Sequence, residues 1–329
     1  MRAAHPEQQQ RLYAKLCREL GPSTLAALAD PDVTEVMCNP DGCLWIESYA
    51  QGMREIGDRL TETQIESLIG TVAALLGTVV HSRAPIVEGE LPINGYRFEG
   101  ILPPVSTAPT FVIRKSTSQA YTLEDYAKAG IMTTVQREVF LDAVRERRNI
   151  VIAGGTASGK TTLANALMRE IVALGDPAER IVILEDTREL RCEARNAVQL
   201  HTGDAADLTR LVRVTMRLRP DRIIVGEVRG GEALALLKAW NTGHPGGITT
   251  VHANSAAAAL LRLESLIQES GAPPQPRLVA ETVDLVAFIV RTPEGRRVRE
   301  LVRVNAYDVA RGSYLLEPVG PQPMEIEHA

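Results

Sequence analysis

Aromatic side chains and cysteines are both scarce in this sequence. Phenylalanine, tryptophan and tyrosine together make up 4% of its 329 residues, and no two of its four cysteines form a CxxC pair. Cysteines without paired spacing indicate neither a disulfide framework nor a zinc site. A core with few aromatics must be built from aliphatic side chains, which suits layered α/β packing. We interpret the cysteines as small buried apolar residues; they are Cys17, Cys38, Cys43 and Cys192.

Long apolar runs and clusters of positive charge are also missing. No apolar run approaches the roughly 18 residues that a membrane-spanning helix needs, and the first residues, MRAAHPEQQQ, lack the apolar core of a signal peptide. We therefore expect a cytoplasmic protein. The formal net charge of −5 argues against a surface that neutralises a nucleic-acid backbone, because phosphate contacts need clustered lysine and arginine. Nucleic acid is thus a weak candidate for a partner.

The length of the chain predicts two domains, because 329 residues exceed what one hydrophobic core usually supports. For residues 1–118 the pattern predicts a smaller α+β domain. A Pro-Asp-Gly turn at 40–42 joins its first two β-like segments as a hairpin. Helical spacing occurs at 7–20, 24–30 and 61–77, and β-like segments occur at 34–39, 43–48, 88–105 and 111–115.

Residues 119–329 are predicted to form an α/β domain with a short C-terminal extension. The boundary falls in a polar, weakly periodic segment, 116–132, after which helices alternate with continuous apolar strands. Such apolar runs are typical of a mostly parallel sheet that helices cover on both faces. Strands are expected at 149–154, 180–186, 197–200, 222–227 and 248–253.

The sharpest motif is GGTASGKTT, which follows one predicted strand and opens a helix. It matches the P-loop pattern in full, and this context makes a mere glycine-rich turn a poor alternative. In such a loop the backbone N–H groups surround phosphate, the lysine reaches the β- and γ-phosphates of ATP, and the next hydroxyl binds Mg²⁺. We therefore predict a RecA-like P-loop domain. The loop residues are Gly154, Gly155, Thr156, Ala157, Ser158, Gly159, Lys160, Thr161 and Thr162.

A second predicted strand, within RIIVGEVRG, ends in Glu227. The carboxyl end of a strand lies at the edge of an open parallel sheet where ligands bind. A carboxylate there can hold Mg²⁺ through water and orient the water that attacks the γ-phosphate. Taken alone, a glutamate at a strand end is more often a solvated surface charge. The P-loop on a neighbouring strand favours the catalytic role.

Two further segments carry polar groups close to predicted strands. Glu185 ends a third strand within LEDTRE. Either the acids there help to bind Mg²⁺ and polarise water, or the segment is a strand-end loop in which Asp and Thr cap the next turn. The segment TGHPGGITTVHAN places His244 and His252 around one strand. Either histidine could sense phosphate or donate to it, although a lone histidine is usually structural or exposed.

Taken in order, GGTASGKTT, ILEDTREL, LRPDRIIVGEVRG and TGHPGGITTVHAN resemble the Walker A, Asp-box, Walker B and His-box motifs of the secretion ATPase superfamily. This family drives type II and type IV secretion, pilus assembly and pilus retraction. The resemblance extends over most of residues 80–290, and four motifs in this order make it specific. The chain lacks a four-cysteine zinc module and an AIRAGE-like C-terminal stretch. It is therefore most similar to the TrbB-type conjugal-transfer ATPases of type IV secretion systems.

The resemblance implies Mg-ATP as the ligand, with Lys160 on the phosphates and with Thr161 and Glu227 at the metal. An arginine that neutralises transition-state charge can contribute about 10³–10⁵ in rate. Without the resemblance we would interpret the arginines as strand-surface charges, and Arg83 is a weaker candidate. The implied catalytic residues are Glu227 in Walker B, Glu185 in the Asp box, His244 and His252 in the His box, and Arg97 and Arg114 in the N-terminal domain.

The loop departs from the family's usual GPTGSGKTT at two positions. Gly155 replaces a proline and Ala157 replaces a glycine, so the backbone near the β-phosphate must accept a Cβ atom at Ala157. The threonine and lysine of the motif remain in place. We therefore expect the change to affect the rate more than the binding of nucleotide.

The resemblance also implies a homohexamer at the cytoplasmic face of the inner membrane, in peripheral contact with the membrane or with inner-membrane components of a secretion or pilus apparatus. It would hydrolyse Mg-ATP to power type IV secretion, conjugal transfer or pilus assembly. Two alternatives stay open: an assembly scaffold gated by nucleotide binding without turnover, and a RecA-like motor that translocates DNA. A Glu227→Gln variant that still supports function would favour the scaffold, and the acidic charge balance argues against the DNA motor.

Overall fold

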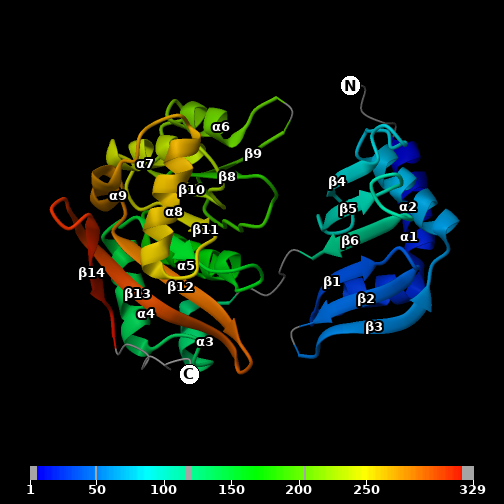
Figure 1. The fold of residues 1–329 in the computed structure, drawn as a ribbon, viewed down its shortest axis with the longest axis horizontal. Coiled ribbons are helices and arrows are strands. Elements are labelled where there is room, and N and C mark those ends of the chain that lie inside the picture. The colour runs from blue at the N-terminus through cyan, green and yellow to red at the C-terminus, as the bar shows by residue number, and fades with distance from the viewer. Residues whose placement is uncertain (1–5, 49, 116–120, 204, 321–329) are drawn as a thin grey trace. The chain divides into compact units, whose positions relative to one another are not determined.

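The structure, a computed structural model, describes residues 6–48, 50–115, 121–203 and 205–320. The chain divides into two compact units, residues 1–119 and 120–329 (Figure 1). The predicted boundary between residues 118 and 119 lies outside the described residues.

The first unit is built on a six-stranded antiparallel sheet with the strand order β3-β2-β1-β6-β5-β4. The predicted hairpin is confirmed, since β1 pairs antiparallel with β2. The two expected N-terminal helices are one element broken at Gly21, which has a left-handed φ of 72°. In chain order the elements are α1 (Pro6–Ala29), β1 (Val33–Cys38), β2 (Cys43–Ser48), β3 (Gly52–Arg59), α2 (Glu62–Leu75), β4 (Ile86–Glu90), β5 (Arg97–Ile101) and β6 (Thr110–Arg114).

Alternation of apolar side chains along these strands gives the sheet one buried face. Val36, Ile46 and Ile113 are buried in a core with apolar residues of α1 and α2. Helix α2 begins after Thr61, whose side chain accepts a hydrogen bond from the backbone of Gln64 in a capping box. The α+β character of this unit is therefore as predicted. Strand β3 was not predicted, because it lies at the sheet edge with mostly exposed residues and shows no apolar alternation.

The second unit is built on an eight-stranded sheet with the strand order β14-β13-β12-β7-β11-β10-β8-β9. From β12 to β9 neighbouring strands are parallel, and β13 and β14 are added antiparallel at one edge. The predicted α/β class with a mostly parallel sheet is confirmed. The elements are α3 (Leu123–Lys128), α4 (Thr134–Arg145), β7 (Ile150–Ala153), α5 (Lys160–Leu174), β8 (Ile181–Glu185), β9 (Ala197–His201), α6 (Leu208–Thr215), β10 (Arg222–Val225), α7 (Glu232–Asn241), β11 (Ile248–Val251), α8 (Ala256–Glu269), α9 (Pro276–Thr282), β12 (Leu285–Thr292), β13 (Gly295–Asp308) and β14 (Ser313–Pro318).

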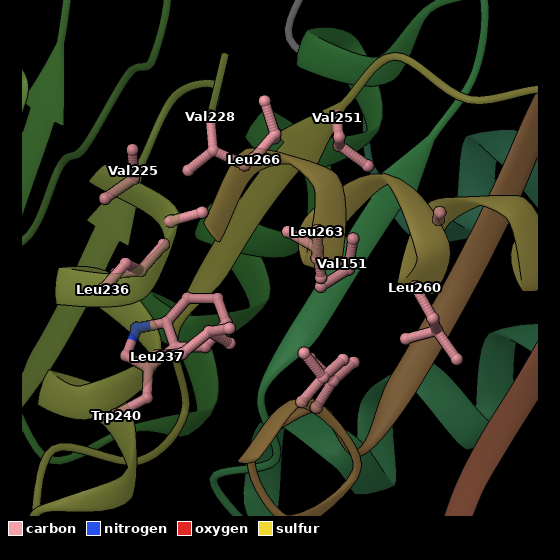
Figure 2. Close-up of a cluster of buried hydrophobic side chains, with 14 of the residues drawn as sticks. Val151, Val225, Val228, Leu236, Leu237, Trp240, Val251, Leu260, Leu263 and Leu266 are labelled. Atoms are coloured by element: carbon pink, nitrogen blue, oxygen red, sulfur yellow. The ribbon is translucent and has the colours of Figure 1, made fainter. Parts of the chain in front are cut away.

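Helices cover both faces of this sheet, and successive strand residues enter different cores. Val151 and Val225 belong to the core that includes residues of α6, α7, α8 and α9. Ile152 and Ile224 belong to the core that includes residues of α3, α4 and α5. Figure 2 shows part of the first core, where Nε1 of Trp240 also donates a hydrogen bond of 2.9 Å to a backbone carbonyl of β10. Burial on both faces explains why these strands read as continuous apolar runs.

Two parts of the second unit differ from the prediction. The segment 116–132, expected as a polar connection, contains α3, whose Leu123 and Tyr126 are buried in the core. The C-terminal extension is part of the main sheet, because β12 pairs in parallel with β7 and carries β13 and β14. Exposed and buried residues are interspersed along β13, so no continuous apolar run marked it in the sequence.

The cysteines occupy two environments. Cys38 and Cys43 are buried as expected, whereas Cys17 and Cys192 are only partly buried, so the expectation of burial is wrong for that second pair. Among the helices of the described residues, none combines the length and the apolar character needed to cross a membrane.

Candidate active site

The GGTASGKTT segment forms a loop between β7 and α5 at the carboxyl edge of the parallel sheet. A side chain at Gly154 would place its Cβ 2.4 Å from the carbonyl oxygen of Ile289 and 2.4 Å from Oγ of Ser158. Gly159, which precedes α5, has a left-handed φ of 101°. Both positions therefore require glycine, and the tight loop leaves the backbone N–H groups at the start of α5 able to bind an anion.

The two departures from the usual loop sequence have different structural consequences. Gly155 has open space where a Cβ would lie, so no neighbour requires glycine there. Ala157 adopts a left-handed φ of 57°. For a residue with a Cβ, that conformation costs roughly 1–2 kcal/mol of free energy. The glycine usual at this position would avoid the cost.

A buried hydroxyl group marks the loop as a site for an anion. Ser158 is 3% exposed, and within the described residues its Oγ has no hydrogen-bond partner. Buried polar atoms in proteins are normally paired, and a helix N-terminus attracts phosphate. The residues of this loop therefore fit the phosphates of a nucleotide.

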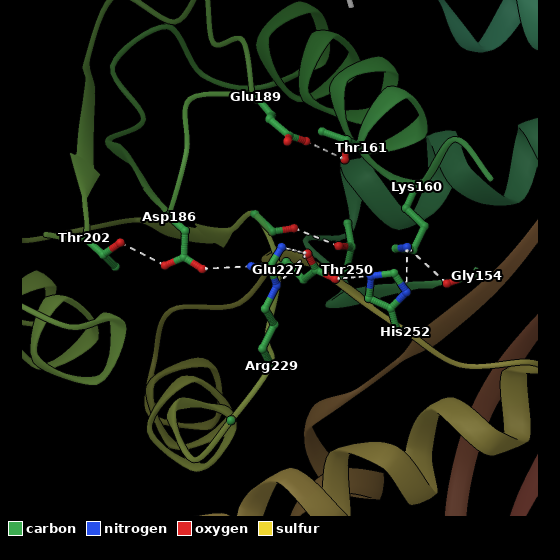
Figure 3. Close-up of polar contacts among 12 residues, drawn as sticks. Gly154, Lys160, Thr161, Asp186, Glu189, Thr202, Glu227, Arg229, Thr250 and His252 are labelled. Carbon is green, nitrogen blue, oxygen red and sulfur yellow. Dashed lines mark hydrogen bonds and ion pairs between the residues drawn. The ribbon is translucent and has the colours of Figure 1, made fainter. Parts of the chain in front are cut away.

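Lys160 turns back onto its own loop. It is 8% exposed, and its ammonium donates to the carbonyl oxygens of Gly154 at 3.1 Å and Gly155 at 2.9 Å. On another side, Nζ lies 3.5 Å from Nδ1 of His252 (Figure 3). The cation assigned to the β- and γ-phosphates is thus held at the loop by backbone carbonyls.

His252 follows β11 and connects the loop to the neighbouring strand β10. Its Nε2 lies 2.8 Å from Oε1 of Glu227. Lysine can only donate, so Nδ1 is the acceptor toward Lys160 and the ring proton of the neutral tautomer is on Nε2, the nitrogen beside Glu227. Burial lowers the pKa of His252 below its ordinary 6.5, the charge of Lys160 lowers it further, and Glu227 opposes them. His252 is therefore neutral at neutral pH.

Glu227 follows β10, and its two carboxylate oxygens have different neighbours. While Oε1 faces His252, Oε2 accepts hydrogen bonds from Nε of Arg229 at 3.0 Å and from its Nη2 at 2.6 Å. The Arg229 guanidinium also lies 3.6 Å from Oδ2 of Asp186. Burial alone would lower the pKa of Arg229. The hydrogen bond to Glu227 and the negative charges of Glu227, Asp186 and Glu189 outweigh burial, so the pKa of Arg229 is raised. Arg229 lies within the RIIVGEVRG segment, but its role was not predicted.

The acid that contacts Thr161 is Glu189. The Thr161 hydroxyl donates to Oε2 of Glu189 at 3.1 Å. Asn165 on α5 donates to the backbone carbonyl of Glu189 at 3.0 Å and accepts from the N–H of Arg191 at 2.7 Å. These bonds hold the loop after β8 against the P-loop helix. Glu189 belongs to the acidic segment found in the sequence, but its position beside the expected metal ligand depends on this packing.

Glu185 orders the same loop from its buried base. Glu185 is 3% exposed. Its Oε1 accepts hydrogen bonds from the backbone N–H groups of Glu189 at 3.0 Å and Leu190 at 2.7 Å. Glu185 thus anchors the turn after β8, whereas the alternative left open by the sequence gave the capping to its Asp and Thr. A direct role of Glu185 at the metal stays a prediction.

His244 lies at the opposite edge of the sheet from the P-loop. It precedes β11, and its Nδ1 donates to the carbonyl oxygen of Pro220, just before β10, at 2.8 Å. Residues 245–251 separate it from His252, and the four of them that form β11 alone span about 13 Å of extended chain. A strand carries its two ends to opposite edges, so His244 does not lie beside the P-loop of its own unit. A role of His244 at phosphate stays a prediction.

The first unit holds the predicted arginines on adjacent strands. Arg97 on β5 lies opposite Arg114 on β6, and Nε of Arg114 lies 3.0 Å from Oε1 of Glu35 on β1. Glu90 on β4 lies opposite Arg97, so charged residues form a row across four strands. Arg83 is exposed in the turn before β4. The roles of these arginines at a nucleotide stay predictions.

Arg296 is a neighbour of the P-loop that the sequence analysis missed. It lies near the start of β13, which returns along β12 beside β7. A Cβ at Gly159 would lie 2.9 Å from Cδ of Arg296, so this side chain packs against the last loop residue. No motif signals such a residue, because it reaches the loop through sheet topology alone.

The donor groups fit Mg²⁺ bound together with a nucleotide. The described residues contain no group of three or more His, Cys, Asp and Glu side chains that could hold a metal ion. In a P-loop site Mg²⁺ needs no such group, because phosphates and water complete its coordination beside one or two carboxylates. The hydroxyl of Thr161 and the carboxylate of Glu189, 3.1 Å apart, supply suitable oxygen ligands.

Together, the parallel sheet and the loop at its carboxyl edge define a P-loop nucleotide-binding protein. The model of the Type II/IV secretion system protein family matches residues 18–320. The chain therefore belongs to this family, and the resemblance found in its four motifs is confirmed.

Individual relatives agree with this assignment. The chain is 51% identical over 314 residues to the probable conjugal transfer protein TrbB of Sinorhizobium fredii, with 95% of this chain and 94% of that protein covered. It is 50% identical over 304 residues to the conjugal transfer protein TrbB of Rhizobium radiobacter, with 92% of each covered. The X-ray structure of the Legionella pneumophila ATPase DotB matches with a TM-score of 0.61 and 22% identity over 94% of this chain and 83% of that one. That likeness supports the fold.

Proposed function

We propose that this chain is an ATPase that hydrolyses Mg-ATP at the carboxyl edge of the sheet in its second unit. The observation that carries the proposal is the series of contacts from Lys160 through His252 to Glu227, with separations of 3.5 Å and 2.8 Å. It joins a phosphate-binding cation, a neutral imidazole and a carboxylate at the ends of adjacent strands. A carboxylate held beside a phosphate loop can orient water for in-line attack on the γ-phosphate.

The residues divide the work between binding and hydrolysis. Loop N–H groups and Lys160 bind the phosphates, and Thr161 with Glu189 and Glu227 would hold Mg²⁺, which neutralises charge on the β- and γ-phosphates when bound. Glu227 orients the attacking water and accepts its proton. Nε2 of His252 lies 2.8 Å from one oxygen of Glu227, and a neutral imidazole there adds no positive charge beside the carboxylate.

We further propose that the chain works as a homohexamer that powers type IV secretion, conjugal transfer or pilus assembly. Support comes from its family and from relatives named as conjugal transfer proteins. In the ring, Arg97 and Arg114 would bring positive charge to a nucleotide, within one subunit or between two. The proposed partners are inner-membrane components of the apparatus, which the protein meets from the cytoplasm as a peripheral component.

Steady-state hydrolysis of Mg-ATP by the purified protein tests the enzymatic part. Glu227→Gln is expected to lower kcat by about 10²–10⁴-fold, as the loss of a general base does, while ATP still binds. Lys160→Ala is expected to weaken ATP binding as well. Tight ATP binding by the wild type without turnover would contradict the proposal and favour the scaffold.

Two additions test the remaining parts. Turnover indifferent to double-stranded DNA is expected, whereas DNA-stimulated turnover with steep salt dependence would identify a DNA motor. Sedimentation with Mg-ATP should show an assembly of six chains of 35.8 kDa, and full turnover by a monomer would contradict the ring. Arg97→Ala should lower kcat, and Arg54→Ala on the edge strand β3 serves as its control.

A further inference from the structure

Arg229 lies within a series of polar contacts that crosses the carboxyl edge of the sheet. Thr202 donates to Oδ1 of Asp186 at 2.9 Å, and Oδ2 of Asp186 lies 3.6 Å from Nη1 of Arg229. Arg229 contacts Glu227, and Glu227 contacts His252 (Figure 3). These residues follow β9, β8, β10 and β11, so the contacts run in the order of the strands in the sheet.

The contact between Arg229 and Glu227 restricts the carboxylate. Nε and Nη2 of the guanidinium both donate to the same oxygen, Oε2, at 3.0 Å and 2.6 Å. The terminal torsion of a glutamate is intrinsically broad, so without such a partner the carboxylate would rotate. With Oε2 held by Arg229, Oε1 is left facing His252, whose other ring nitrogen lies 3.5 Å from Nζ of Lys160.

The backbone around Arg229 is itself anchored. Its N–H group donates to Oε1 of Glu232 at 2.6 Å, and the N–H of Gly230 donates to the same oxygen at 2.9 Å. Glu232 opens α7. The guanidinium therefore extends from a tethered segment toward Glu227 and Asp186.

We infer that Arg229 is a positioning residue for hydrolysis, which orients Glu227 toward the attacking water and is itself held by Asp186. This inference rests on the proposed ATPase activity. It joins the acidic loop after β8 to the catalytic carboxylate after β10, so a movement of that loop changes the geometry of Glu227.

The test measures kcat and KM for Mg-ATP in Arg229→Gln, Glu227→Gln and the double variant. Misplacing a catalytic group by about 1 Å can cost on the order of 10²-fold, so Arg229→Gln should lower kcat on that scale with little change in KM. Because Arg229 acts through Glu227, adding Arg229→Gln to Glu227→Gln should change kcat by less than about twofold. An equal loss in both backgrounds, or a raised KM with unchanged kcat, would overturn the inference.

Two further variants separate orientation from charge. Arg229→Lys keeps the charge but loses the planar pair of donors, so it should recover only part of kcat; full recovery would show that charge alone suffices. Arg262→Gln is the matched control. Like Arg229, Arg262 lowers the pKa of His252 by its charge, but its ion pair is with Glu269, at 3.8 Å, and not with Glu227. It should leave kcat within about twofold of the wild type, and a loss equal to that of Arg229→Gln would overturn the inference.

Thermal unfolding of the same proteins without nucleotide supplies a readout that does not need turnover. The destabilisation of the double variant should be smaller than the sum of those of Arg229→Gln and Glu227→Gln, because each removes the same contact. Strict additivity would overturn the inference. A wild type that does not hydrolyse ATP would contradict the proposed function, whereas a wild type that does so and tolerates Arg229→Gln would contradict this inference alone.

Discussion

The two edges of the parallel sheet both carry charged side chains, but in opposite arrangements. At the carboxyl edge the side chains of Arg229 and His252 are 52% and 48% exposed and contact other side chains from strand to strand. At the amino edge the side chains of Arg222 and Glu179 are 3% and 7% exposed and pair at 2.9 Å. Partly exposed partners can be exchanged for a ligand, whereas buried partners cannot be released without a large cost. The first edge is therefore suited to function and the second to stability.

Backbone groups complete the amino edge. Arg222 donates to the carbonyl oxygen of Gly246 at 3.3 Å, and Oδ1 of Asn149 accepts from the N–H groups of Gly246 and Gly247 at 2.9 Å and 3.0 Å. Burial lowers the pKa of Arg222, and the charge of Glu179 opposes that shift. His244 belongs to this edge through its bond to the backbone before β10. These bonds tie the strand ends together.

The largest expected effect comes from the same substitution at each edge. Glu179→Gln leaves the buried guanidinium of Arg222 without its acid, and Arg147 loses the same partner at 2.9 Å. We expect the free energy of unfolding to fall by about 3–5 kcal/mol, as for a broken buried ion pair. Glu227→Gln should cost less than about 1 kcal/mol, as for an exposed pair, but should abolish most turnover. Urea denaturation of both variants checks this, and equal destabilisation would remove the distinction between the edges.

The two histidines allow a matched comparison of function. In His252→Asn the amide can replace Nδ1 toward Lys160 but cannot reach Glu227, so kcat should fall by about 10–10²-fold. In His244→Asn the amide can still donate to the carbonyl of Pro220, and kcat should change by less than about twofold. Steady-state Mg-ATP hydrolysis by both variants is the measurement. A larger loss at His244 would show that the far edge contributes to the reaction.

The pH dependence of His252 tests the charge balance of the carboxyl edge. Burial and the charges of Lys160, Arg229 and Arg262 lower its pKa below 6.5, against the opposing charge of Glu227. The unfolded chain thus binds the proton more tightly, so the stability from this group is present above pH 6.5 and is lost as the pH falls toward the lowered pKa. An NMR titration of the imidazole in the nucleotide-free protein should give a midpoint below 6.5. A midpoint above that value would show that Glu227 dominates.

The smallest expected effect concerns the phosphate loop. Ala157→Gly relieves the left-handed conformation of Ala157, whose φ is 57°. The greater freedom of glycine in the unfolded chain offsets part of this gain, so the free energy of unfolding should rise by less than about 1 kcal/mol. Gly155→Ala is the control, because a Cβ there meets open space. Thermal unfolding of both variants measures the effect, and a less stable Ala157→Gly protein would contradict the explanation.

Much of the fold was predictable because the patterns were local. The apolar runs at Ile150–Ala153 and Ile223–Val225 became central strands, and the hairpin of β1 and β2 formed around its turn. Elements without a one-sided pattern were missed, as the exposed edge strand β3 shows. The same holds for the site. Sequence motifs identified Lys160 and Glu227 as site residues, whereas no motif around Arg296 indicated that it lies beside the P-loop.

The sequence by itself determined the phosphate loop, the strand that precedes it, the helix that follows it and the family, because these depend on neighbours along the chain. Only the tertiary structure decided that Glu189 contacts Thr161, that His252 and not His244 contacts Lys160, and that Arg229 holds Glu227. The physical reason is the strand order, in which β7, β11, β10 and β8 lie side by side although the chain visits them in another order. Residues distant in sequence become hydrogen-bonded partners only when these strands align at one edge.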